Sequence, residues 1–220
     1  MKGGAYVLGL LLALTAAGCG GDDDGEASAT TSAAAESGCR SVSQPPARRA
    51  ARRRAPTQRL NARTRYRLAF RTSCGSFTVT LDQRSAPRTT ASLVALTRAR
   101  FFDRTAFHRI VPGFVIQGGD PTGTGMGGPG YKTVDKPPAR VRYTRGSVAM
   151  AKAGNEPPGT AGSQFFVVTG QDAGLPPEYA LLGKVTKGLD VAEKIGMLGD
   201  PATEQPTAVV AIESVKVASK

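Results

Sequence analysis

The sequence predicts a mainly β domain that combines antiparallel strands with two helices. Glycine and proline are frequent, at 27 and 15 of 220 residues, which favours a turn-rich β fold over a helical bundle. Several short runs alternate apolar and polar side chains, as half-buried strands do, and two stretches repeat apolar residues at helical spacing. Aromatic residues make up 6% and tryptophan is absent, so the core must be mostly aliphatic.

The strands and helices follow one another in short segments. The first two strands, 66–71 and 77–81, alternate apolar and polar residues, and Cys74-Gly75 between them is a hairpin turn signal. A helix begins at Ala86-Pro87, with apolar residues on one face and arginines on the other. Residues 121–145 form a long Gly- and Pro-rich excursion, and such loops are usually functional or mobile. Further strands are expected at 147–151, 164–169, 181–185 and 209–217, and a second amphipathic helix at 189–198.

The positive charge of the chain is concentrated in one segment. The formal net charge is +12, and residues 40–71 contain eleven Arg and no Asp or Glu. Residues 72–220 contain 17 basic and 12 acidic residues, so this part carries only about +5. A basic run of this kind is usually a solvated linker, and we expect no nucleic-acid partner.

The first residues have the pattern of a targeting segment. Lys2 provides a positive start, and 5–17 is an apolar run too short to span a bilayer, as in a signal peptide. The run ends in Leu14-Thr15-Ala16-Ala17-Gly18-Cys19, which is similar to a bacterial lipobox, in which the Cys becomes the lipidated first residue. We therefore expect a lipoprotein signal peptide at 1–18 and a lipid anchor at Cys19. The alternative is an ordinary secretory signal with an incidental cysteine.

Residues 19–64 are expected to form a disordered, lipid-anchored, Arg-rich linker. Its first half is rich in Gly, Ala, Ser, Thr and acidic residues, which cannot bury a core. The arginine clusters at 48–49 and 52–54 leave two interpretations open. They are either part of a solvated linker or a contact site for polyanions such as lipid headgroups.

The run 101–120 organises the domain. Two apolar strand-like stretches flank the Pro112-Gly113 turn, and Gly118-Gly119 lets the backbone turn sharply after the second one. Its segment FHRIVPGFVIQGGD (107–120), with GSVAMA (146–151) and GSQFFVV (162–168), resembles the signature of cyclophilin-type peptidyl-prolyl cis-trans isomerases. The resemblance covers 65–220 and implies a closed eight-stranded antiparallel β-barrel capped by two α-helices.

The chemistry that the resemblance implies needs no nucleophile, metal or cofactor. An X-Pro bond is a tertiary amide with a rotation barrier of about 18–20 kcal/mol, which arises from amide resonance. Twisting the bond leaves a lone pair on the prolyl nitrogen, and a fixed cation that donates to it favours the twisted state. By resemblance Arg109 has this role, with Phe114 and Gln117 as the other catalytic residues. The planar, permanently charged fork of arginine suits the task better than lysine.

The resemblance also implies a pocket for the proline ring and a groove for the peptide. The pocket residues are expected to be Phe114, Val115, Phe166 and Leu175, with Tyr179 at the rim. Since side chains alternate on a strand, one of Phe165 and Phe166 should face the core and the other the cleft. The groove residues are expected to be Gln164, Ala151, Lys152 through its backbone, and His108, for which we favour an architectural over a direct role. Two departures from the family pattern matter. Human-type members of the family carry Trp where this chain has Gly174, and His where it has Tyr179.

Two cysteines remain after Cys19. An exported protein meets an oxidising environment, so Cys39 and Cys74 are expected to form a disulfide, the alternative being two free thiols. The chain has a single His and no His/Cys cluster, so no metal site is expected.

Together these features predict a peptidyl-prolyl cis-trans isomerase that assists the folding of exported proteins. We expect a monomer, held by its lipid anchor on the extracytoplasmic face of the cell membrane, that acts on proline-containing polypeptides. The alternative from a different functional class is a non-catalytic module that binds proline-containing peptides at the cell surface.

Overall fold

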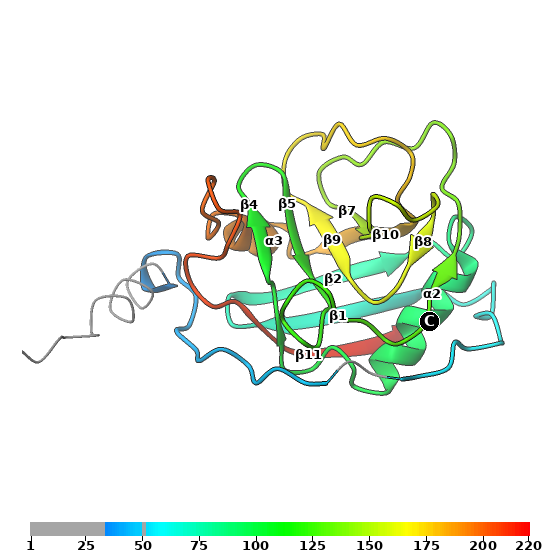
Figure 1. The fold of residues 1–220 in the computed structure, drawn as a ribbon, viewed down its shortest axis with the longest axis horizontal. Coiled ribbons are helices and arrows are strands. Elements are labelled where there is room, and N and C mark those ends of the chain that lie inside the picture. The colour runs from blue at the N-terminus through cyan, green and yellow to red at the C-terminus, as the bar shows by residue number, and fades with distance from the viewer. Residues whose placement is uncertain (1–33, 50–51) are drawn as a thin grey trace, which may run out of the picture.

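The computed structural model describes residues 34–49 and 52–220. Its main feature is a curled nine-stranded antiparallel sheet with the order β3-β11-β1-β2-β10-β7-β9-β5-β4, accompanied by a two-stranded sheet of β6 and β8 (Figure 1). The strands are β1 (Tyr66–Thr72), β2 (Gly75–Leu81), β3 (Thr105–Ala106), β4 (Arg109–Val111), β5 (Val115–Gly118), β6 (Thr133–Val134), β7 (Ser147–Met150), β8 (Thr160–Ala161), β9 (Phe165–Val168), β10 (Leu181–Lys187) and β11 (Ala211–Ser219). The helices are α2 (Pro87–Arg98) and α3 (Leu189–Gly196), and neither is long and apolar enough to cross a membrane.

The closed eight-stranded barrel implied by the resemblance is not what the structure contains. Nine strands form a half-barrel, and its edge strands β3 and β4 are not paired with each other within the described residues. The reason lies in Phe107 and His108, which separate these short strands. Phe107 N–H donates to Val210 O next to β11, whereas His108 N–H donates to Gln117 O on β5, so the chain changes partners between the two residues.

The main core lies between the concave face of the sheet and the two helices. Strands β1 and β2 contribute Phe70 and Phe77, whose rings stack with centroids 4.7 Å apart, and Phe165 from β9 meets Phe70 at 5.3 Å. Helix α2 packs on β11 and β6, whereas α3 packs on β2, β4 and β5, so the helices cover opposite ends of the sheet (Figure 1). This packing leaves the outer face of β4, β5, β9 and β7 available for a site.

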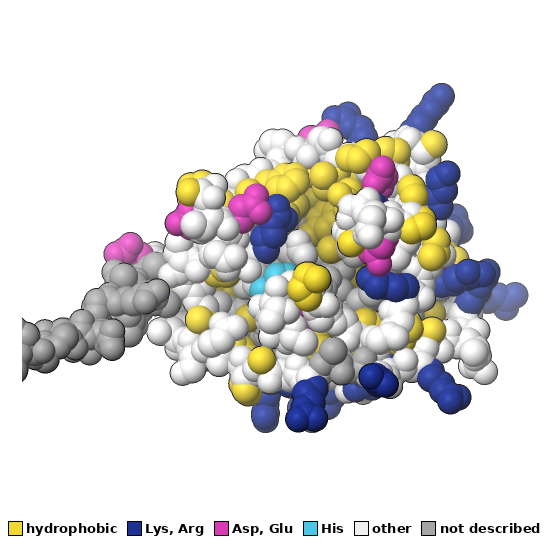
Figure 2. Space-filling model, viewed as in Figure 1, with side chains coloured by type: hydrophobic (Ala, Val, Ile, Leu, Met, Phe, Trp, Pro, Cys, Tyr) yellow, Lys and Arg dark blue, Asp and Glu magenta, His cyan; other side chains and the backbone are white. Residues whose placement is uncertain are grey.

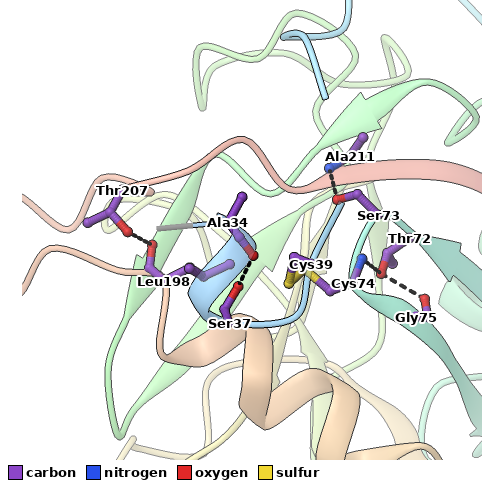
Figure 3. Close-up of a disulfide and its surroundings, with 10 residues drawn as sticks. All are labelled: Ala34, Ser37, Cys39, Thr72, Ser73, Cys74, Gly75, Leu198, Thr207 and Ala211. Carbon is purple, nitrogen blue, oxygen red and sulfur yellow. Dashed lines mark hydrogen bonds between the residues drawn. A yellow bond between two sulfur atoms is a disulfide. The ribbon is translucent and has the colours of Figure 1, made fainter. Parts of the chain in front are cut away.

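The described part of the predicted linker lies against the domain. Cys39 and Cys74 form a disulfide with sulfur atoms 2.11 Å apart, and both side chains are buried (Figure 3). Next to it, Arg40 N–H donates to Ser73 O at 2.9 Å. We call residues 34–49 and 52–64 the strap.

The strap continues along α2 and the Gly-rich excursion. Backbone N–H groups of Arg48 and Arg53 donate to the carbonyls of Pro121 and Pro129, each at 2.9 Å. Both guanidinium groups lie over the buried ring of Phe101, at 5.9 and 5.6 Å from its centroid. The expectation of a disordered linker therefore does not describe these residues, because ring faces and carbonyl acceptors on the domain bind them. Burial lowers the pKa of Arg48 from its ordinary value, although Asp103 opposes the effect.

Candidate active site

The strand register places several predicted site residues in one row across the outer face of the sheet. Arg109 on β4 pairs with Gln117 on β5, which pairs with Phe166 on β9. Phe166 pairs in turn with Ala149 on β7. Because residues directly opposite each other share a face, the cation, the amide and the aromatic ring lie side by side. The row joins residues that are almost 60 positions apart in the chain only because β9 inserts between β5 and β7.

An apolar pocket, separate from the main core, lies beside this row. Val115 and Phe166 are buried in it, and Phe114, Leu175 and Tyr179 pack against them while staying partly exposed, together with Ala151. Phe165 belongs to the main core and Phe166 to the pocket, which is the alternation expected for neighbours on a strand. Figure 2 shows a hollow lined by hydrophobic side chains, with basic and acidic side chains at its rim.

Three aromatic rings form one wall of the pocket. Tyr143, Phe166 and Tyr179 meet edge to face, with centroids 5.5 to 6.3 Å apart. The buried hydroxyl of Tyr143 donates to Tyr179 O at 2.6 Å and accepts from Tyr179 N–H at 3.0 Å. Burial raises the pKa of Tyr143 to about 12, so the hydroxyl keeps its proton. Sequence reasoning missed Tyr143, whose only signal was an aromatic residue within a Gly- and Pro-rich stretch.

A chain of polar side chains runs along the rim. Arg109 donates through Nε to Glu204 Oε2 at 2.6 Å, and its Nη1 lies 3.5 Å from Gln117 Oε1. Gln117 Nε2 donates to Gln164 Oε1 at 3.0 Å, and Gln164 Nε2 donates to the carbonyls of Gly125 and Gly127. Each amide is therefore oriented by its neighbour, and the remaining N–H groups of the guanidinium are left for a ligand.

Glu204 is the second residue that sequence reasoning missed. It lies 95 residues after Arg109, in the turn that precedes β11, and its backbone carbonyl accepts from Ile110 N–H at 3.0 Å. The hydrogen bond and charge of Arg109 lower the pKa of the Glu204 carboxyl below its usual value. The guanidinium is thus held on its Nε edge by Glu204, while its Nη1 lies beside Gln117.

The Gly-rich excursion closes one side of the site. The buried carboxylate of Asp120 accepts from the backbone of Thr122 at 2.7 Å and of Gly127 at 3.1 Å. Burial by itself raises the pKa of Asp120, but the hydrogen bonds from Thr122, Gly127 and Gly125 outweigh it, and the net shift is downward. A charged carboxylate therefore ties the loop into the shape in which Gln164 reaches its carbonyls.

The structure places His108 and Lys152 at the edges of the site. His108 lies beneath the loop, and burial lowers its pKa below the ordinary value, against opposing effects of Asp120 and Gln164. The ammonium of Lys152 pairs with Glu178 at 2.9 Å and lies 5.7 Å from the Tyr179 ring centroid, with its side chain only 3% exposed. Its side chain therefore supports the pocket wall. Cys19, the predicted lipidation site, lies outside the described residues.

The arrangement joins an apolar pocket to an oriented, unreactive cation. The described residues hold no group of three or more His, Cys, Asp or Glu able to share a metal ion. Such a site can bind an uncharged ring and donate hydrogen bonds beside it. In agreement, the family model of cyclophilin type peptidyl-prolyl cis-trans isomerases/CLD matches residues 67–217.

This chain belongs to the cyclophilin-type peptidyl-prolyl cis-trans isomerases. A peptidyl-prolyl cis-trans isomerase of Arabidopsis thaliana is 37% identical over 154 residues, which cover 68% of this chain and 92% of the relative. Peptidyl-prolyl cis-trans isomerase A of Mycobacterium tuberculosis is 36% identical over 164 residues, 66% of this chain and 88% of the relative. The crystal structure of a Cryptosporidium parvum cyclophilin type isomerase in the presence of the dipeptide Ala-Pro has 30% identity and a TM-score of 0.64, and the match covers 70% of this chain and 99% of that one.

Within this cyclophilin, Gly174 lies between Ala173 and Leu175, which pack against the pocket, and adds no side chain to it. Its φ of +61° is one that residues other than glycine rarely adopt, and a Cβ built at this position would meet no atom within 4 Å. Tyr179, by contrast, is enclosed by Tyr143, Phe166 and Lys152. The two departures from the family pattern therefore differ. Gly174 contributes no side chain, whereas Tyr179 contributes a ring to the pocket wall.

Proposed function

We propose that this cyclophilin isomerises X-Pro bonds by holding the proline ring in the pocket of Phe114, Val115, Phe166, Leu175 and Tyr179 while Arg109 donates to the prolyl nitrogen. The donation is strongest when the amide is twisted and the nitrogen carries a lone pair, so it lowers the barrier rather than binding the planar substrate more tightly. Gln117 and Gln164 bind the peptide backbone, and the backbone next to Ala151 and Lys152 lines the groove.

The observation that carries this proposal is the row of Arg109, Gln117 and Phe166 on adjacent strands. The cation is fixed by Glu204 on one edge, so reorganisation during bond rotation is small. A pocket without such a cation would bind the planar and the twisted amide equally well and would accelerate nothing.

The test measures isomerisation and binding on the same protein. A protease-coupled assay with an X-Pro peptide gives kcat/KM, and NMR exchange spectroscopy on the same peptide gives the interconversion rate without protease. Saturable acceleration in both supports the proposal. Saturable binding with an unchanged interconversion rate would establish the alternative, a non-catalytic proline-peptide-binding module.

We further propose that the enzyme assists the folding of exported proteins from the extracytoplasmic face of the cell membrane, as a lipid-anchored monomer. Two features support this location. The segment before Cys19 is similar to a lipobox, and the Cys39–Cys74 disulfide is of a kind that persists in oxidising compartments.

The anchor can be tested at Cys19 alone. Cys19→Ala should move the protein from the membrane fraction to the soluble or secreted fraction, because the lipid has no other attachment point in the lipobox. Cys39→Ala is the matched control and should leave the distribution unchanged. Membrane association that survives Cys19→Ala would contradict the lipid anchor.

A further inference from the structure

Four arginines without a carboxylate partner gather at one end of the sheet. Several other basic side chains, among them Arg71, Arg100, Arg109 and Arg145, form ion pairs. The four in question form none within the described residues, and they line a single cavity of about 590 Å³. They are Arg63, Arg65, Arg67 and Arg84.

The cavity lies where the strap leads into β1. It shares no lining residue with the isomerase pocket. Its walls come from 62–67, from the end of β2 and the following loop at 80–84, and from Lys220. Figure 1 places this end of the sheet near α2 and the C-terminus. None of its lining residues belongs to the proline pocket or to its polar rim.

The backbone around the cavity is fixed on three sides. Arg65 and Lys220 exchange backbone hydrogen bonds at 2.8 and 3.2 Å, and Arg67 pairs with Thr80 in the β1–β2 ladder. Gln83 Nε2 donates to Thr64 O at 2.7 Å, which ties the 82–85 loop to the end of the strap. The arginines therefore stand on a preorganised frame rather than on a free tail.

The one side-chain carboxylate in the lining does not neutralise these arginines. Asp82 accepts from the backbone of Arg84 and Ser85, both at 3.1 Å, and from the Ser85 hydroxyl at 2.6 Å. Meanwhile Arg67 Nε is buried and has no hydrogen-bond partner within the described residues. A buried charged donor without an acceptor is unfavourable, and so is the gathering of like charges. An anion placed among the guanidiniums would relieve both.

We infer that this cavity binds a phosphate group, as inorganic phosphate or as the phosphodiester of a lipid headgroup. Several planar forks that line one cavity provide the donors that the tetrahedral set of acceptor oxygens on phosphate requires. The site differs from the polyanion contact considered for 48–54, since the guanidiniums of Arg48 and Arg53 are already committed to Phe101. Binding here would orient the enzyme on an anionic surface without occupying its active site.

The first experiment titrates inorganic phosphate into the full chain and follows the Nε–H resonance of Arg67 by NMR. We expect a saturable shift that weakens as salt is added. Arg65→Gln/Arg84→Gln should weaken the affinity at least about tenfold, the loss expected for a charge-assisted hydrogen bond, while isomerase activity stays unchanged. Arg67→Lys keeps the charge but lacks the buried Nε donor, and should also weaken binding, which calorimetric titration measures in this variant because it lacks the Arg67 resonance.

The matched control is Lys136→Gln/Arg140→Gln, which removes two exposed charges outside the cavity. It should leave the Arg67 titration unchanged. A titration that does not saturate, or an equal loss of affinity in the control pair, would overturn the site.

Vesicles identify the source of the phosphate. Sedimentation of the full chain with phosphatidylglycerol/phosphatidylcholine vesicles should exceed that with phosphatidylcholine alone if the ligand is a lipid headgroup, and Arg65→Gln/Arg84→Gln should remove the excess. Saturable phosphate binding without such an excess assigns the site to soluble phosphate. The absence of both effects would refute the inference.

Discussion

The active-site hairpin and the strap both hold arginines against the domain, but the contacts that hold them differ. Arg109 is held by strand pairing and by Glu204, so its guanidinium points in one direction. Arg48 and Arg53 are each held by a backbone hydrogen bond and by the face of Phe101, whose carbonyl also accepts from Arg48 Nη2. In the hairpin we propose that the charge acts on a ligand, whereas in the strap it fastens one segment to another. Changes in the hairpin should therefore alter the rate, and changes in the strap should alter stability.

Among these changes, Arg109→Ala should separate the effect on the rate most clearly from the effect on stability. It removes the cation that Glu204 holds beside the pocket, and kcat/KM should fall by about two to three orders of magnitude, as for a lost donor at developing charge. Arg109→Lys should recover little, because a point charge cannot reproduce the fork. The thermal midpoint should change little, since Arg109 contacts only groups at the surface of the site. Wild-type kcat/KM in folded Arg109→Ala would refute the proposed role.

The converse change is removal of the disulfide. Cys39→Ser/Cys74→Ser should lower the free energy of unfolding by about 2–4 kcal/mol, because the link closes a loop between cysteines 35 residues apart. The isomerase kcat/KM should stay within about twofold of wild type. Denaturant unfolding and the X-Pro assay measure the two quantities, and reducing agent provides the control, since it should destabilise wild type and not the variant. A rate loss as large as the stability loss would show that the strap is part of the site.

A third change tests the pocket wall. Tyr143→Phe keeps the three rings but leaves the backbone N–H and carbonyl of Tyr179 without their partner. We expect roughly tenfold weaker peptide binding, a loss within the range for leaving these two buried backbone groups unpaired. Tyr131→Phe is a matched control, because its hydroxyl contacts Ser92 instead. Direct peptide titration that gives equal affinities for both variants would contradict this role of Tyr143.

The smallest effect is expected from Glu204→Gln. Arg109 lowers the pKa of Glu204, so the ion pair is complete above the ordinary carboxyl pKa and is lost as pH falls through the lowered value. Wild-type kcat should therefore fall a few-fold on strong acidification, whereas the variant should show the lower kcat at neutral pH and no such acid step. Glu213→Gln, which pairs with Arg40 and Arg71 instead, is the control for the pH profile. An acid step that persists in Glu204→Gln would assign it to another group.

Much of the fold could be predicted, because long alternating runs such as β1, β2 and β11 carry a clear period. The two-residue strands β3, β6 and β8 could not be predicted, since they are too short to show one. The same limit explains why the open edges of the sheet could not be predicted, since they depend on the different hydrogen-bond partners of Phe107 and His108.

The site divides in a similar way. Arg109, Gln117 and Phe166 lie within recognisable motifs, and a fixed strand register brings them together. Glu204 contacts Arg109, 95 residues away, and Tyr143 contacts Tyr179, 36 residues away. Both lie in segments without regular structure, and no local sequence pattern predicts the conformation of such segments. The course of the strap could not be predicted for a related reason. Its composition is that of a free linker, and only its contacts with the domain surface determine where it runs.

The Cys39–Cys74 link also has a mechanical consequence. A pulling force applied to the chain before Cys39 passes through the covalent bond into the turn between β1 and β2, so it never loads residues 40–73. The hydrogen bonds of the strap residues after Cys39 and of the β1–β11 ladder are then spared, whereas residues 34–38 lie before the disulfide and carry the load. Tension instead enters at a buried hairpin turn in the main core. Because of the disulfide, the strap residues after Cys39 bear no tension, and the main core takes up the applied force.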